Sequence, residues 1–272
     1  MAASPRSKAL SLRHLASTYL RLISAQFRAI TEYPADFWTM AATGLILQAV
    51  QVGFIGVVFA NVTSLGGWGF HAMLVLMGFM VLADSITEVG WDGIWTVGRQ
   101  IVTGDMDYKI TRPLPVMLQV GASAIGMQSA ANVTTGSIMI AVGWNGADIP
   151  AAMIPAALLL FACAVVVQLT VITILCCVAF FMKGPNVSFA YLGAQIQENA
   201  TRFPLQIYPR VVRGALTWVV PFAFVNFIPV SILTGELPLW WLAFPPLVAA
   251  ALIALATLIT RTGLARYESA GH

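Results

Sequence analysis

The chain has 272 residues, of which 59% are hydrophobic and only 9% are charged, and its net charge is +3. A soluble globular domain carries about 25% charged residues, so 14 basic and 11 acidic side chains are too few to cover a soluble protein of this length. Together with a mean hydropathy of +0.84, this indicates an integral membrane protein. It excludes a disordered chain and a disulfide scaffold, and the small net charge gives no reason to expect a nucleic-acid partner.

Five apolar segments are long enough to cross a bilayer, which takes about 20 residues of helix. They lie at 37–60, 70–83 (continuing past Asp84 to Ile86), 116–144, 151–182 and 239–260. The segment 185–237 is too long for one span and too apolar for a loop, and the alternation typical of membrane strands is absent. We therefore predict an all-α membrane protein with six transmembrane helices, folded as one transmembrane domain at 37–262.

The distribution of lysine and arginine predicts the orientation in the cell membrane. Five basic residues precede the first span and three lie in the loop after the second, whereas the loops after the first and third spans have none. Both the arm 1–36 and the tail 263–272 are therefore predicted to be cytoplasmic.

The arm itself has a helical pattern. Arg13, Ser17, Arg21, Ser24 and Arg28 recur every three or four residues, with leucines and aromatic residues between them. This spacing predicts an amphipathic helix in the cytoplasmic interface, ending before Pro34. Such a helix either anchors the arm to the membrane surface or docks a cytoplasmic partner.

Motifs for nucleotide, metal or covalent chemistry are missing from the sequence. None of the three lysines (Lys8, Lys109 and Lys183) stands in a G-x-x-x-x-G-K-[ST] motif. The three histidines are far apart, and no metal-ligand spacing or nucleophile motif occurs. We therefore expect no enzyme activity, no metal and no cofactor on this chain.

The cytoplasmic segment 88–113 combines carboxylates, tryptophan and glycine. Mixed charge with aromatic residues suits a short helix that docks into a groove of another protein, and the alternative is a solvated connecting loop. The candidate docking residues are Glu88, Trp91, Asp92, Arg99, Gly104, Asp105, Asp107, Arg112 and Pro113.

Three stretches resemble the permeases of type-2 ATP-binding-cassette (ABC) exporters. Residues 99–114, RQIVTGDMDYKITRPL, resemble the pattern R-x-x-x-x-G-x-[LM]-[DE]-x-x-[LI]-x-x-P-L. Residues 202–235 resemble the signature F-P…[YF]-P…R…P…P…L-x-G. Residues 33–38, YPADFW, are similar to one branch, the permeases of viologen and drug exporters. The resemblance extends over nearly the whole chain.

The resemblance implies a six-helix half-transporter whose segment 88–113 holds a coupling helix that docks on a separate ATPase. It also implies a fifth span at about 186–203 and short re-entrant helices on the outer side at 204–235. The implied gate residues are Pro204, Tyr208, Pro209, Arg213, Pro221 and Pro229. Arginines on the outer side would oppose the positive-inside trend, and the alternative places the fifth span at 214–234. The prolines favour broken helices over a full span.

Polar residues with helical spacing mark a candidate translocation pathway. One set lies in the implied fifth span and the other in the third span, and polar groups within a membrane face a cavity or a partner. They are Ser188, Tyr191, Gln195, Glu198, Asn199 and Arg202, and Gln128, Asn132 and Thr135. The alternative is an interhelical hydrogen-bond network with a Glu198–Arg202 ion pair.

The resemblance implies that the chain works as a dimer with an identical or similar permease. Two ATPase subunits would bind ATP and magnesium, and the pair of permeases would export amphiphilic, drug-like or cationic compounds. One alternative is an ion-coupled secondary transporter, which usually has inverted repeats and more intramembrane carboxylates than Asp84 and Glu198. The other is a membrane scaffold or assembly protein that transports nothing.

Overall fold

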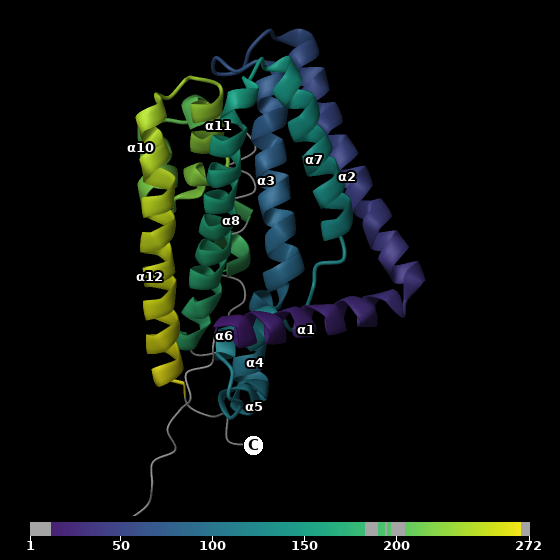
Figure 1. The fold of residues 1–272 in the computed structure, drawn as a ribbon, viewed down its shortest axis with the longest axis vertical. Helices are drawn as coiled ribbons and strands as arrows, with labels where there is room; N and C mark the ends of the chain where they lie inside the picture. Colours follow the sequence, from purple (N-terminus) through teal and green to yellow (C-terminus); the bar gives the residue numbers. More distant parts are fainter. Residues whose placement is uncertain (1–11, 183–189, 194, 197–204, 268–272) are drawn as a thin grey trace, which may run out of the picture.

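The fold is all-helical in the computed structural model, which describes residues 12–182, 190–193, 195–196 and 205–267 and forms no β-strand within them. The α-helices, labelled as in Figure 1, are α1 (Leu12–Thr31), α2 (Pro34–Asn61), α3 (Phe70–Trp91), α4 (Val97–Thr103), α5 (Asp105–Ile110), α6 (Val116–Gly121), α7 (Ser129–Gly146), α8 (Ile154–Cys177), α10 (Arg210–Gly214), α11 (Phe227–Leu233) and α12 (Phe244–Ala265). Short 3₁₀ segments extend α3, α8 and α12.

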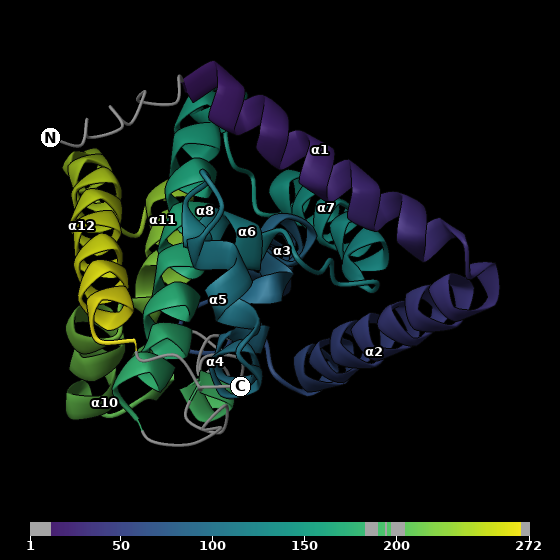
Figure 2. The ribbon, with the colours of Figure 1, turned by 90° about the horizontal axis from the view of Figure 1, so that it is seen from below.

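The long helices stand side by side, and α1 lies across one end of them (Figure 1). Seen from that end, α1 runs over α7 and meets α2 at a corner (Figure 2). Arg13, Arg21 and Arg28 are exposed along α1, whereas Leu15 and Leu22 are half-buried. The predicted amphipathic helix is therefore present, and Pro34 begins the next helix as expected.

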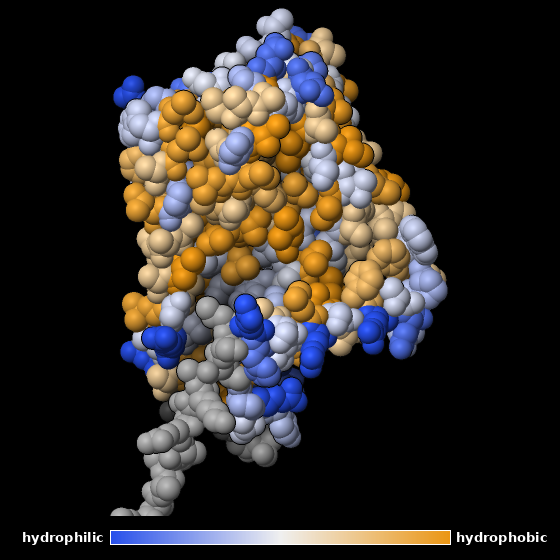
Figure 3. Space-filling model, viewed as in Figure 1, coloured by the Kyte–Doolittle hydropathy of each residue, from blue (hydrophilic) through white to orange (hydrophobic). Residues whose placement is uncertain are grey.

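Four segments are long and apolar enough to cross a membrane: Pro34–Asn61, Phe70–Thr103, Ala151–Phe181 and Leu239–Ala265. They agree with the predicted first, second, fourth and last spans. An apolar belt covers the middle of the molecule between more polar ends (Figure 3). These features are those of an integral membrane protein; the number of six spans remains a prediction.

The predicted third span, 116–144, is wrong as a single helix. Helix α6 ends at Gly121 and α7 begins only at Ser129. Between them, the N–H of Gly126 donates to the carbonyl of Glu88 at 3.1 Å, which ties the break to the end of α3. The break is therefore stabilised by contacts with a distant part of the chain rather than by local sequence.

Helices α3 and α7 approach each other closely because glycines face the contact. A Cβ added to Gly143 would lie 2.7 Å from the carbonyl oxygen of His71, and one added to Gly136 would lie 3.1 Å from the backbone nitrogen of Leu82. Small residues allow this kind of backbone contact between membrane helices.

Residues 205–235 form short helical pieces at the end of the bundle opposite α1 (Figure 1). Phe222 and Phe224 are fully buried there, and α11 packs on α3 and α8. The alternative fifth span, 214–234, is not a continuous helix, because the chain turns at Pro221 between a π-helical segment and α11. The implied fifth span, 186–203, lies largely outside the described residues; 190–193 and 195–196 are helical.

Candidate functional site

The predicted docking segment 88–113 divides into two parts with different surroundings. Its first part, the end of α3 and the 3₁₀ turn Asp92–Thr96, lies inside the bundle and borders a cavity. Its second part, α4 and α5, projects beyond α1 at the end of the molecule (Figure 1). We call α4 and α5 together the tip.

The tip is a sharp helical hairpin with a buried anchor. Gly104, between the two helices, has φ of +77°, which glycine adopts without steric cost. The Met106 side chain is 0% exposed and belongs to a hydrophobic cluster with Ile94, Val97 and Met117. Such a short hairpin is therefore held in place by packing against the rest of the chain.

Polar contacts fix the tip further. The Lys109 ammonium donates to Oε1 of Gln100 at 2.6 Å, and burial lowers its pKa while Asp105 opposes that shift. The Gln119 amide donates to the carbonyls of Lys109 and Leu114 at 2.9 and 3.0 Å. These bonds hold one side of the tip in place, and the other side is exposed. The exposed residues of the tip and of the three positions after it are Arg99, Val102, Thr103, Asp105, Tyr108, Ile110, Thr111, Arg112 and Pro113.

The end of the last helix touches the tip. The Tyr267 ring contacts Phe180 edge-to-face, with centroids 6.4 Å apart. Burial and the neighbouring carboxylate of Asp107 raise the pKa of Tyr267 to about 12. The tip, the end of α8 and the end of α12 are thus joined by direct contacts, so a displacement of the tip would reach two long helices.

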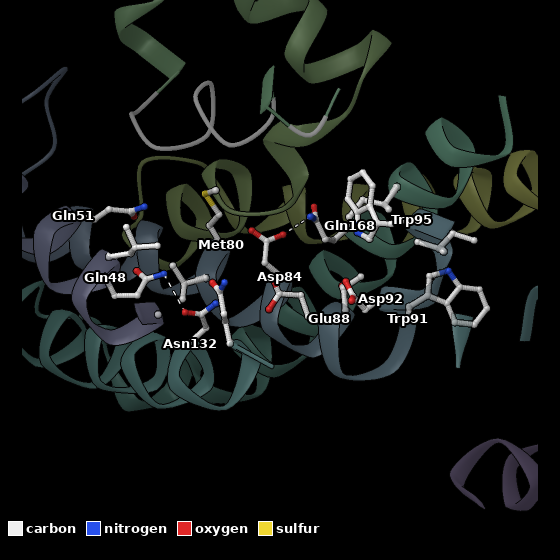
Figure 4. A pocket seen from close by; sticks show the side chains of 17 residues that line it. Gln48, Gln51, Met80, Asp84, Glu88, Trp91, Asp92, Trp95, Asn132 and Gln168 are labelled. Atoms are coloured by element: carbon white, nitrogen blue, oxygen red, sulfur yellow. Dashed lines mark hydrogen bonds between the residues drawn. The ribbon is translucent and has the colours of Figure 1, made fainter. Parts of the chain in front are cut away.

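A cavity of about 310 Å³ lies between α2, α3, α7 and α8, beside the C-terminal half of α3 and the 3₁₀ turn that follows it. Its wall combines carboxylates, amides and two tryptophans with aliphatic residues, and Figure 4 labels all of these polar and aromatic residues except Gln128. They are Gln48, Gln51, Asp84, Glu88, Trp91, Asp92, Trp95, Gln128, Asn132 and Gln168. We call it the α3 cavity.

Three carboxylates follow one another along α3 and the turn after it (Figure 4). Asp84, Glu88 and Asp92 are four residues apart, so they share one face of the helix. The Gln168 amide donates to Asp84, and Glu88 interacts with the Asn132 amide, which also accepts from Gln48 at 3.4 Å. Oε2 of Glu88 is buried and has no hydrogen-bond partner in the described part of the chain.

Trp91 lines this cavity and packs between α6 and α8. Its Nε1 donates to Oγ1 of Thr173 at 2.9 Å. A Cβ added to Gly121 would lie 2.5 Å from a ring carbon of Trp91, so the ring packs directly on this glycine. Tyr19 of α1 reaches the same place, since its hydroxyl donates to the carbonyl of Gly90 and its ring lies 6.3 Å from that of Trp91. Helix α1 therefore contacts the backbone between Glu88 and Asp92.

The structure brings some of the predicted pathway residues together and not others. Gln128 and Asn132 line the α3 cavity beside Glu88, Trp91 and Asp92. Thr135 instead donates to the carbonyl of Ala131 at 3.0 Å and does not line the cavity. Tyr191 is exposed and Gln195 is half-buried, and neither lines the cavity. The predicted residues outside the described ones are Ser188, Glu198, Asn199, Arg202 and Pro204.

The other predicted gate residues are spread along the short helices. Tyr208 packs against the main hydrophobic core, and Pro209 and Pro221 directly precede α10 and a 3₁₀ turn. Pro229 is buried within α11, and Arg213 is half-buried in α10. Their arrangement agrees with a chain broken by prolines; a gating role remains a prediction.

Several residues that line the α3 cavity were not among the predicted site residues. Gln48, Gln51, Trp95 and Gln168 were not singled out, and Asp84 was noted only as an intramembrane acid. The four-residue spacing of the acids on α3 could have indicated one polar face. No comparable signal shows which glutamines of other helices complete the wall. In the described residues, no three histidine, cysteine or carboxylate side chains are placed to hold a metal ion.

The sequence model of the ABC-2 family of transporter proteins matches residues 45–271 of this chain. The chain belongs to the ABC-2 transporter family. No curated protein and no solved structure matches it. Membership makes this ABC-2 protein a membrane component of an ABC transporter and confirms the resemblance to type-2 ABC permeases; residues 99–114 and 202–235 lie within the match. The match starts after residues 33–38, so the viologen and drug exporter branch stays a prediction.

Proposed function

We propose that the chain is the permease subunit of an ABC exporter, paired with an identical or similar permease and driven by two ATPase subunits that bind ATP and magnesium. Its substrates are amphiphilic or cationic compounds. The single observation that carries the proposal is the tip: a hairpin held from inside by Met106 that presents charged, aromatic and aliphatic side chains away from the bundle.

The composition of the exposed tip suits a protein partner. Tyr108 is 73% exposed and Ile110 45% exposed, with Arg99 and Arg112 on the same hairpin. Interfaces are enriched in tyrosine and arginine, and such side chains on a short helix fit a groove on a cytoplasmic ATPase. When the two ATPases close on ATP, the tip would move with them.

The contacts of the tip suggest how that motion reaches the substrate. Met106 packs with Ile94, which lies in the turn that borders the α3 cavity, and Tyr267 connects Asp107 to the end of α12. Close packing transmits displacements rather than absorbing them. A shift of the tip would therefore change the α3 cavity and the helices around it together.

The two alternative functions fit less well. An ion-coupled secondary transporter leaves the exposed tip without a role, and neither ion-coupled transport nor scaffolding is the activity of the ABC-2 family. Neither alternative has a specific observation in its favour.

The proposal is tested by replacing Asp105 and Asp107 together with alanine. The purified complex of permease and ATPase should lose coupling: ATP hydrolysis would no longer be stimulated by substrate, and export would fall. The matched control is Glu32→Ala, which removes an exposed carboxylate at the same end of the molecule and should leave both activities unchanged. Normal export and normal stimulation in the double variant would overturn the coupling role.

A further inference from the structure

A second hollow, with a volume of about 470 Å³, lies between α6, α8 and α12. Helices α8 and α12 stand side by side (Figure 1), and both belong to segments that are long and apolar enough to cross a membrane. Ile253 and Thr257 on the α12 wall are exposed, so the hollow opens on the outer surface of the bundle. We call it the α12 groove.

The hydroxyl groups along the α12 groove are already bonded within the protein. Those of Thr170, Thr173 and Thr257 each donate to a carbonyl one turn earlier in the same helix, at 2.7 Å. The indole N–H of Trp91 donates to Thr173, and the hydroxyl of Thr260 lies 3.6 Å from the sulfur of a buried cysteine. Threonines that bond their own helix in this way present methyl groups to their surroundings. The middle of the groove is therefore an apolar surface with few hydrogen bonds to offer a ligand.

Arg261 is the one charged side chain among the residues that line the groove, and they include no carboxylate that could pair with it. Helix α12 itself contains no aspartate or glutamate. A guanidinium group donates two parallel hydrogen bonds to a phosphate, and such charge-assisted bonds are stronger than neutral ones. A single positive charge beside an apolar groove complements a ligand with an anionic head and an apolar chain.

The position of the groove along α12 matches one leaflet of a bilayer. From Ile253 to Arg261 is eight residues, about 12 Å of helix, and half of a hydrocarbon core is about 15 Å deep. Arg261 is near the end of α12, and just beyond it Tyr267 interacts with Asp107 of the tip, which is predicted to be cytoplasmic. Anionic lipids are concentrated in the cytoplasmic leaflet, and basic pockets between helices on that side bind their head groups.

We propose that the α12 groove binds an anionic phospholipid of the cytoplasmic leaflet, with its phosphate on Arg261 and one acyl chain along Ile253, Ala256 and Thr257. The lipid is a resident ligand of the subunit and not the compound that it transports, so the inference goes beyond the proposed function. A free phosphate ion would use Arg261 but would leave the apolar wall uncovered. The acyl chain covers that wall, which is why the two parts of the groove together indicate a lipid.

The bound lipid would contact the residues that support the tip. The α6 side of the groove, Pro115 to Met117, follows the tip in the chain, and Met117 belongs to the same hydrophobic cluster as Met106. Trp91 lines both this groove and the α3 cavity. An occupied groove therefore fills the space between α12 and the packing that positions the tip and one wall of the cavity.

The test is native mass spectrometry of the purified, delipidated full chain, titrated with phosphatidylglycerol and with phosphatidylcholine of the same acyl chains. The wild type should bind phosphatidylglycerol at least about tenfold more tightly, because only this lipid has a net negative charge for the guanidinium group. Arg261→Gln should remove most of that preference and leave phosphatidylcholine binding unchanged. The matched control is Arg28→Gln, which removes an exposed arginine of α1 and should bind both lipids as the wild type does.

A second pair of variants tests the apolar part of the groove. Thr257→Trp places a large ring in it and should weaken the binding of both lipids, although Arg261 is intact. Leu258→Trp puts the same ring at a position that is 59% exposed and does not line the groove, and it should bind as the wild type does.

Two comparisons need only the wild type, so they decide even if a variant fails to fold. Equal affinity for the two lipids would overturn the site, and so would displacement of phosphatidylglycerol by excess glycerol 3-phosphate, which would indicate a site for phosphate alone. Among the variants, an unchanged lipid preference in Arg261→Gln or an equal loss in Arg28→Gln would assign the preference to other charges. Unchanged binding in Thr257→Trp, or an equal loss in Leu258→Trp, would overturn the acyl-chain position.

Discussion

Replacing Met106 by alanine should release α5 from the bundle while the transmembrane helices stay folded. Met106 is 0% exposed, and its neighbours come from the turn after α3 and from α6. Truncating a buried methionine to alanine costs about 2–5 kcal/mol, including the cavity that remains. Helix α5 has only six residues, so it has little stability without this anchor.

The expected size of the effect follows from these values. A loss of about 2–5 kcal/mol would raise the open population of the tip roughly 30- to 5,000-fold. Hydrogen exchange of the amides of residues 105–110 measures this opening directly, and their exchange rates should rise by that factor. The exchange of α3 and α8 should change little, and substrate-stimulated ATP hydrolysis should fall.

The control lies two residues away on the same helix. Tyr108 is 73% exposed, so Tyr108→Ala should keep the exchange of residues 105–110 at the wild-type rate and still reduce ATPase stimulation. The two variants thus separate the anchoring of the tip from its contact with the partner. Unchanged exchange in Met106→Ala would refute the conclusion that packing of this side chain holds the tip.

Other parts of the chain allow three more predictions. A cysteine at Gln206, with the native cysteines replaced, should react with an impermeant thiol reagent from outside the cell; labelling from the cytoplasm alone would contradict the outer-side placement of this region. Gly143→Ala should lower the stability by about 1–3 kcal/mol, because its Cβ would lie 2.7 Å from the carbonyl oxygen of His71. Gly53→Ala, with nothing within 4 Å, is the control, and equal unfolding temperatures would contradict the close packing. The pKa of Tyr267 is raised from 10.0 to about 12, so between these pH values the folded state keeps a proton that the unfolded state releases. The stabilisation that Tyr267 contributes is therefore complete below pH 10 and is lost as the pH rises to 12. Tyr267→Phe should remove that part of the pH dependence of unfolding, and an unchanged dependence would assign it to another group.

The parts of the fold that depend on local pattern were predictable from the sequence. The arginine spacing of residues 13–28 predicted a helix that the structure places at Leu12–Thr31, and the apolar runs 37–60 and 239–260 fall within long helices. Pro34 ended one helix and began the next because proline is tolerated only in the first turn of a helix.

The break in the predicted third span depends on contacts between distant residues. Residues 122–128 contain no proline and no charged residue that would end a helix, but the Gly126 amide bonds to the carbonyl of Glu88. Gly93 also lets the turn after α3 approach α6, since a Cβ there would lie 2.0 Å from the carbonyl oxygen of Val120. Such tertiary contacts override local preference, and one sequence does not reveal them.

Only some of the residues that line the α3 cavity could be predicted from the sequence, for a similar reason. The four-residue spacing of Asp84, Glu88 and Asp92 fixes their common face, and the sequence contains that information. Which face of α2 and α8 turns toward these acids depends on how the helices rotate as they pack. Gln48 and Gln168 therefore join the wall only in the folded chain.

The central claim is that the tip of this permease docks on an ATPase, and site-specific photo-cross-linking tests it most directly. A photoreactive phenylalanine analogue at Tyr108 in the full chain, irradiated in the native membrane, should cross-link to a subunit that contains a nucleotide-binding P-loop. The same analogue at Trp240, which is 63% exposed in the 3₁₀ turn before the start of α12, should give no such product. An ATPase cross-link from Tyr108 alone is the predicted result. Its absence from Tyr108, or an equal yield from Trp240, would contradict the account.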